Sequence, residues 1–144
     1  MNVAGSEINS NLIIIVNDNE QSIAEVHGGM YKNLAELRET GGTASNNLFK
    51  AFGLDYIYEE NGNDIASLIS LFHKVKDTDH PIVVHIHTQK GKGYEIAEKD
   101  KEGWHWCMPF DRETGKPTIS FGDGEDYTSI TAEYIMQKAK SDSE

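Results

Sequence analysis

The stretch Asn11–Gly29, NLIIIVNDNEQSIAEVHGG, decides the fold. Five apolar residues run without a break over Leu12–Val16, and the polar segment Asn17–Glu20 follows at once. A short, continuous, β-branched run predicts a strand that is covered on both faces, as in a parallel sheet. The amide and carboxylate oxygens after it suit either a polar turn or the shell of a hard cation such as magnesium.

Five further segments have the spacing of regular elements. They are a helix over Asn46–Gly53, a strand over Asp55–Tyr58, a helix over Asp64–Lys76, a strand over Ile82–His87 and a helix over Thr128–Lys140. The alternation of strands and helices predicts an α/β fold, with a parallel sheet, flanking helices and right-handed crossovers. Ligands bind beyond the carboxyl ends of the strands in such sheets, so Asn17–Glu20 and Thr88–Gly93 should share one rim. The intervening Glu25–Ser45, with two Gly-Gly pairs around a short helix, is typical of a mobile connection.

Composition limits the function. The 144 residues suffice for one domain with a modest core, and the formal net charge of -11 argues against nucleic acid as the main partner. No apolar run is long enough to span a membrane, and no secretory signal is visible at the start. The single cysteine, Cys107, suits a reducing cytoplasm, and its neighbours in WHWCMPF predict a packed thiol rather than a nucleophile.

Several other motifs have a functional and a structural interpretation. The segment Thr88–Gly93, TQKGKG, could hold phosphate through its glycines and lysines, or be a solvated turn. His85 and His87 lie on one strand face and could bind zinc with His80 or His105, but packed histidines are favoured. Between two tryptophans, His105 could carry protons or fill a core. The Gly-Asp-Gly of Gly122–Gly124 is interpreted as a turn.

Three motifs carry a family resemblance: NDN followed by SIAE, HIHTQKGKGYEIAE, and the H-x-x-x-P-F-D pattern of His105 to Asp111. Together they resemble the 1-deoxy-D-xylulose-5-phosphate synthase family, which belongs to the transketolase-like, thiamine-diphosphate-dependent enzymes. The resemblance implies the condensation of pyruvate with glyceraldehyde 3-phosphate and loss of carbon dioxide. Thiamine diphosphate and magnesium are the implied cofactors, and supply of isoprenoid and thiamine precursors is the implied role.

The resemblance also implies roles for individual residues. Asn19 corresponds to the magnesium-binding asparagine, and Gln21 to a residue that contributes its backbone carbonyl and is usually methionine in the family. Lys90 corresponds to a lysine near cofactor and substrate, and His105 to an active-site histidine. Ile23 falls where the family's chain packs near the cofactor.

By the same resemblance, residues 1–116 are the latter half of the diphosphate-binding domain, 117–126 a linker, and 127–144 the first helix of the following pyrimidine-binding domain. The family's metal-ligating Gly-Asp-Gly precedes NDN, no such motif precedes Asn17 here, and Gly122–Gly124 lies on the wrong side to replace it. The activating glutamate belongs to the pyrimidine-binding domain. We therefore expect the isolated chain to be inactive and to need companion chains, and we expect homo-oligomers because incomplete sheets have unpaired edges. The alternatives are a non-catalytic fragment or assembly module and a small histidine-based zinc-binding protein.

Overall fold

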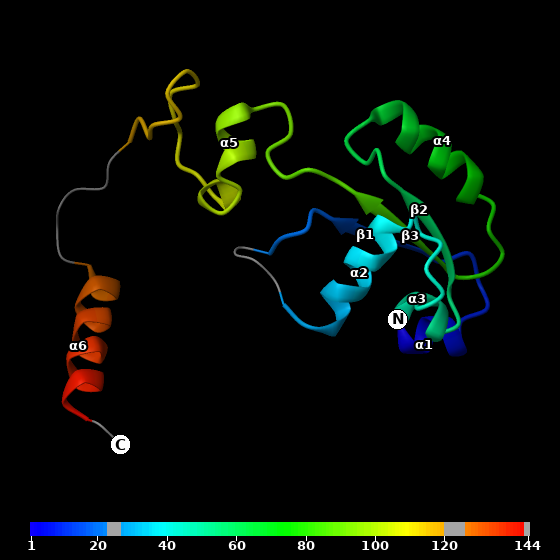
Figure 1. Cartoon of the computed structure of the whole chain (residues 1–144), viewed down its shortest axis with the longest axis horizontal. Helices are drawn as coiled ribbons and strands as arrows, with labels where there is room; N and C mark the ends of the chain where they lie inside the picture. Colours follow the sequence, from blue (N-terminus) through cyan, green and yellow to red (C-terminus); the bar gives the residue numbers. More distant parts are fainter. Residues whose placement is uncertain (23–26, 120–125, 143–144) are drawn as a thin grey trace. The chain divides into compact units, whose positions relative to one another are not determined.

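The computed structural model describes residues 1–22, 27–119 and 126–142. The chain divides into two compact units, Met1–Trp106 and Cys107–Glu144, and the three strands of the described residues lie in the first (Figure 1). In chain order the elements of the first unit are α1 (Asn2–Ser6), β1 (Ile13–Asp18), α2 (Gly29–Glu39), α3 (Leu48–Ala51), β2 (Asp55–Glu59), α4 (Ile65–Val75), β3 (Ile82–His87), α5 (Glu95–Lys99) and the 3-10 turn η1 (Gly103–His105).

The second unit contains helix α6 (Tyr127–Ser141), which begins one residue before the predicted helix. The Asp126 side chain caps α6 by accepting the Ser129 backbone N–H at 2.7 Å. The expected linker and the Gly122–Gly124 motif fall largely or wholly outside the described residues, and the proposed domain division stays a prediction. No described helix has the length and apolar character needed to cross a bilayer.

The sheet confirms the predicted parallel α/β arrangement. Strand β3 is central, and both β1 and β2 pair with it in parallel, in the order β1-β3-β2. The predicted strand over Ile82–His87 agrees with β3, and the predicted helix over Asp64–Lys76 corresponds to α4, which Asp64 caps through the Ser67 N–H. Because the register pairs Asp18 with His87 and Glu59 with Ile86, the three strands end together at one rim.

The two faces of the sheet have separate cores, as expected from the alternation of side chains along a strand. Helix α4 covers one face, where Leu71 and Val75 pack with Val84 and Ile86 of β3. Helices α1, α2 and α3 cover the other, in a cluster of Ala4, Leu34, Leu37, Phe49, Leu54 and Val83 (Figure 1).

The first strand differs from its prediction. Strand β1 is Ile13–Asp18 rather than Leu12–Val16, and it is an edge strand that is not covered on both faces. Ile15 is 54% exposed although it lies on the α4 face, because α4 packs over β2 and β3. The apolar run therefore does not distinguish a central strand from an edge strand.

The short helix expected between the two glycine pairs of Glu25–Ser45 is present as α2, but the described part of this segment packs on the sheet and is not a loose connection. Leu37 is fully buried, Leu34 is nearly so, and both pack on the sheet. The buried Asn33 ties α2 to α3, because its Nδ2 donates to the Asn46 carbonyl at 2.7 Å and its Oδ1 accepts the Leu48 N–H at 3.0 Å. Core packing and these two bonds stabilise a helix whose own apolar pattern is weak.

The predicted packing around Cys107 is wrong as well. Cys107 is exposed, and Trp106 beside it is 70% exposed. Neither belongs to the two hydrophobic clusters of the described residues, so the aromatic residues of WHWCMPF do not form a core around the thiol.

The burial of α2 gives a first prediction. Leu37→Ala should lower the free energy of unfolding by about 2–4 kcal/mol, because it leaves a cavity under the sheet. Met30→Ala on the exposed side of the same helix should change it by less than about 0.5 kcal/mol. Urea denaturation of both variants measures the difference, and equal effects would show that α2 is not part of the folded core.

Candidate functional site

The loop after β1 and the loop after β3 meet at the rim, as the sequence predicted. The backbone N–H of Thr88 donates to the Asp18 carbonyl at 2.9 Å. The Thr88 hydroxyl donates to Asn17 Oδ1 at 2.7 Å. These bonds hold the start of the TQKGKG segment against the end of β1.

The loop Asn19–Ser22, called the β1 loop below, is shaped by two side-chain turns. Asp18 Oδ1 accepts the Glu20 N–H at 3.0 Å, and Asn19 Oδ1 accepts the Gln21 N–H at 3.1 Å. Glu20 has φ of 65°, a left-handed conformation that costs a residue other than glycine about 1–2 kcal/mol. Such a conformation persists only where neighbouring contacts impose it.

Asp18 is the best-connected residue of this region. Its Oδ2 accepts from Arg38 Nη1 at 2.5 Å and lies 2.9 Å from Nε2 of His85. Nδ1 of His85, which is fully buried, lies 2.7 Å from the Tyr56 hydroxyl. We call these four residues the Asp18 network; they come from β1, α2, β3 and β2.

The charges of the network follow from its surroundings. Burial alone would raise the pKa of Asp18, but the hydrogen bonds with His85, the Glu20 N–H and Arg38 outweigh burial and hold that pKa well below its usual range. Burial raises the pKa of Tyr56, so its hydroxyl stays protonated and donates to His85 Nδ1. With Nδ1 accepting from Tyr56, the Nε2–H of His85 donates to the Asp18 carboxylate.

Of the residues singled out from the sequence, Lys90 and His105 lie together. Lys90 Nζ is 3.2 Å from His105 Nδ1 and donates to the Ser22 carbonyl at 3.2 Å. These two contacts join Lys90 to positions 15 and 68 residues away in the chain. The rings of Tyr94 and Trp104 pack edge-on, with centres 5.1 Å apart, and this contact joins the residue before α5 to the turn that carries His105. His105 is exposed rather than part of a core, and Ile23 lies outside the described residues.

The oxygens of the β1 loop fit part of a magnesium shell. Asn19 is half-buried with its Oδ1 turned into the loop, and the buried Gln21 Oε1 has no hydrogen-bond partner among the described residues. Amide and carbonyl oxygens are suitable ligands for this hard cation. The nearby carboxylates are already engaged, Asp18 by Arg38 and His85, and Glu20 by His87 at 2.7 Å. A balancing carboxylate would have to come from elsewhere.

The four histidines considered as zinc ligands do not converge. His85 uses both ring nitrogens within the Asp18 network, and His87 pairs with Glu20. His80 lies 3.3 Å from Asp55, at the amino end of the strands and away from the rim. Within the described part of the chain, no three His, Cys, Asp or Glu side chains are grouped to hold a metal.

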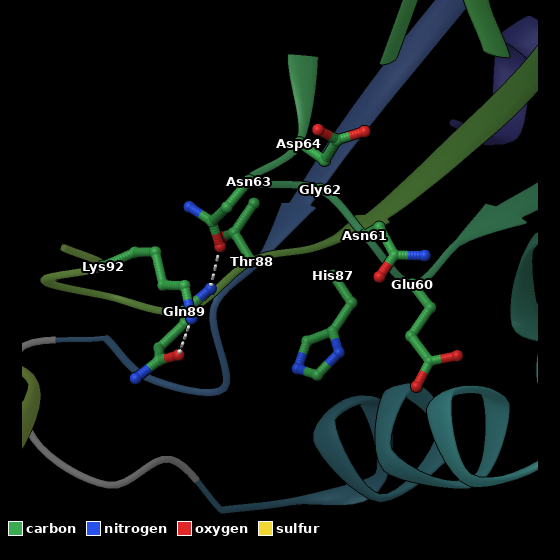
Figure 2. Close-up of a pocket in the computed structure, with 9 residues that line it drawn as sticks. All are labelled: Glu60, Asn61, Gly62, Asn63, Asp64, His87, Thr88, Gln89 and Lys92. Carbon is green, nitrogen blue, oxygen red and sulfur yellow. Dashed lines mark hydrogen bonds between the residues drawn. The ribbon is translucent and has the colours of Figure 1, made fainter. Parts of the chain in front are cut away.

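A hollow opens at the ends of β2 and β3. It has a volume of about 430 Å³ and is lined by residues 60–64, 87–89 and 92 (Figure 2). Asn63 Oδ1 accepts the Gln89 N–H at 2.7 Å, and Lys92 donates to Gln89 Oε1 at 3.2 Å. Gly62 allows the close approach of the two loops, because a Cβ there would lie 2.4 Å from the His87 carbonyl oxygen.

Sequence reasoning missed two parts of this region, Arg38 and the Glu20–His87 pair. Arg38 lies in the segment interpreted as a connection, so nothing marked it as a partner of β1. A helical pattern with Leu34 and Leu37 facing the sheet could have placed Arg38 near the strand ends.

Comparison with known proteins matches most of the residues described above. The sequence model of a family described as 1-deoxy-D-xylulose-5-phosphate synthase matches residues 1–46 and 40–88. The 1-deoxy-D-xylulose-5-phosphate synthase of Yersinia pseudotuberculosis serotype O:1b (strain IP 31758) is 32% identical over 169 residues, covering 95% of this chain and 27% of the relative. That of Syntrophotalea carbinolica is 32% identical over 178 residues, covering 99% of this chain and 28% of the relative. The chain thus spans little more than a quarter of the length of these relatives.

The Asp18 network generates a pH prediction. Asp18→Asn should lower the free energy of unfolding at pH 7 by about 2–3 kcal/mol, because Arg38 and His85 lose a buried anionic acceptor. Since the pKa of Asp18 is lower in the folded state, its contribution is complete above the unfolded pKa, near 3.8, and is lost as pH falls through the folded pKa.

Urea midpoints measured from pH 7 to pH 2.5 test this dependence. The advantage of the wild type over Asp18→Asn should shrink as the pH falls below the unfolded pKa, near 3.8, whereas the exposed Asp79→Asn should follow the wild type throughout. A constant difference between wild type and Asp18→Asn would contradict the assignment.

Proposed function

Because the chain belongs to the 1-deoxy-D-xylulose-5-phosphate synthase family, we propose that it is one part of a thiamine-diphosphate-dependent transferase. The assembled enzyme would condense pyruvate with glyceraldehyde 3-phosphate, release carbon dioxide, and supply precursors of isoprenoids and thiamine. We propose a cytoplasmic location, which suits a chain with a single, exposed cysteine.

One observation carries the proposal: Lys90 contacts both the β1 loop and His105. The residues of three separate sequence motifs therefore meet on one side of the sheet's rim. A parallel sheet has its ligand site at this position, beyond the carboxyl ends of its strands.

Each of these residues has a proposed task. Asn19 Oδ1 and the Gln21 carbonyl would hold magnesium, and Ile23 would pack near the cofactor. When bound, thiamine diphosphate would supply the ylide and stabilise the carbanion. The Lys90 ammonium would attract the phosphate or carboxylate of a substrate as a point charge.

His105 would move a proton at its Nε2 atom. Because the Lys90 ammonium donates to Nδ1, Nε2 is the ring nitrogen of His105 that carries a proton toward the substrate. Nε2–H can then donate to an oxygen that gains negative charge during the reaction, and the exposed position of His105 leaves it accessible to a substrate.

We further propose that companion polypeptides complete the site and that the assembly is oligomeric. The carboxylates next to Asn19 are committed to Arg38, His85 and His87, so the metal's acidic ligand would come from outside the β1 loop. The pyrimidine pocket and the activating glutamate would also come from a companion. The edges of β1 and β2 not paired with β3 are natural positions for contact with further strands.

Cofactor binding gives a direct test. Magnesium and thiamine diphosphate added to the ¹⁵N-labelled chain should shift the amide resonances of Asn19, Gln21 and Lys90. Asn19→Ala should weaken the response at least tenfold because an oxygen ligand is lost, while Asn9→Ala, at an exposed position before β1, should not. Shifts spread evenly over the surface, or none at any concentration, would favour the non-catalytic assembly module instead.

Catalysis gives a second prediction. The purified chain, with pyruvate, glyceraldehyde 3-phosphate, thiamine diphosphate and magnesium, should release no carbon dioxide, because the site is shared between chains. Adding polypeptides that supply the remaining parts of the synthase should restore release, and His105→Ala should reduce the restored rate by about 10²–10⁴-fold. Turnover by the chain alone would disprove the shared site.

A further inference from the structure

The two residues that flank Asn19 both lie beside the same guanidinium. Arg38 Nη1 is 2.5 Å from Asp18 Oδ2, and Arg38 Nε is 3.9 Å from Glu20 Oε1. We propose that Arg38 is a positioning residue, through which helix α2 fixes the conformation of the β1 loop. The proposal rests on the proposed function, because the loop then presents Asn19 and Gln21 to the magnesium diphosphate.

The inner side of this arrangement is rigid. Asp18 is held from beneath by the fully buried His85, which is itself held by Tyr56. The Tyr56 ring stacks on Phe49 of α3, with centres 5.6 Å apart and planes 11° apart. Arg38 therefore joins the β1 loop to a framework built on all three strands.

The β1 loop itself needs support, because the backbone of Glu20 has an unfavourable conformation. Glu20 has a left-handed φ of 65°, a conformation that residues other than glycine seldom adopt. The Glu20 side chain is held by His87 Nε2 at 2.7 Å and by the field of Arg38. Loss of Arg38 would free Glu20 to return to a right-handed conformation and would move Asn19 with it.

The charges around Arg38 favour this positioning role over capture of an anionic ligand. Arg38 borders two hollows of about 270 and 330 Å³, and both are also lined by Glu20. Asp18 and Lys32 border the first, and Glu39 and Glu60 border the second. With its side chain only 18% exposed and its charge balanced by Asp18, Arg38 has little left to offer an incoming anion.

Backbone ¹⁵N relaxation on the full chain tests the proposal. In Arg38→Met, the order parameters of the Asn19, Glu20 and Gln21 amides should fall from about 0.85 to below about 0.6. Arg38→Lys should give an intermediate loss, since a lysine cannot reach both carboxylates with a planar fork. Lys32→Met removes a positive charge from the same helix and should leave the β1 loop unchanged. Unchanged order in a folded Arg38→Met would overturn the proposal.

A second pair of variants tests the same proposal even if the Arg38 variants fail to fold. Tyr56→Phe retains the ring stacking but removes the hydroxyl that fixes the His85 tautomer, so the imidazole ¹⁵N shifts and the β1-loop order should both change. Tyr58→Phe is the matched control, because Tyr58 contacts His85 with its ring, at 5.1 Å. If the two variants behave alike and the β1 loop stays ordered in both, the network does not position the loop.

Titration with magnesium and thiamine diphosphate separates this inference from the proposed function. If the wild type does not respond while Arg38→Met loosens the β1 loop, Arg38 fixes the loop but the loop's role in cofactor binding is wrong. If the wild type responds and Arg38→Met keeps both the order and at least a third of the affinity, the positioning role is wrong. We expect a response in the wild type and an affinity at least tenfold lower in Arg38→Met.

Discussion

The ionised Asp18 carboxylate is the constraint on which the rim of the sheet depends. It ends an edge strand, and three donors converge on it: Arg38, His85 and the Glu20 N–H. A buried carboxylate is stable only when its lone pairs are occupied in this way. The same contacts bring α2 and β3 to the end of β1, so one charge determines both how the elements pack and where the β1 loop starts.

The parallel register also brings together the loops that form the candidate site. Because all three strands end at the rim, the strand register alone makes the loops after β1 and β3 neighbours. Thr88 bridges them with two hydrogen bonds, and Lys90 then reaches Ser22 and His105. The position of Lys90 and His105 is therefore a consequence of strand order and register, with local glycine flexibility adjusting the turn.

Elements with strong local signals were predictable from the sequence, and elements stabilised by distant partners were not. The β-branched run of β3 and the apolar spacing of α4 each specify their own structure, so both were found close to their observed bounds. Helix α2 has glycines on both sides and a short apolar pattern; its stability comes from Leu37 in the core and from Asn33 bonded to α3. The contact between Arg38 and Asp18 spans 20 positions, and neither residue indicates the other in the sequence. The family resemblance singled out Lys90 and His105, which lie together in the structure. Their separation of 15 residues in the sequence would not by itself have indicated that contact.

Charge also supports the proposal that the magnesium site is shared with another segment. A magnesium ion bound only by neutral amide and carbonyl oxygens keeps its full charge, so a diphosphate and at least one carboxylate must balance it. The chain has 24 acidic residues, yet those beside Asn19 are already used to fix the loop. Releasing Asp18 to bind metal would leave Arg38 and His85 without their acceptor and would free the backbone that presents Asn19. Support of the loop and ligation of a metal would thus compete for the same carboxylates, and under the proposed function a ligand from a separate segment would avoid that competition.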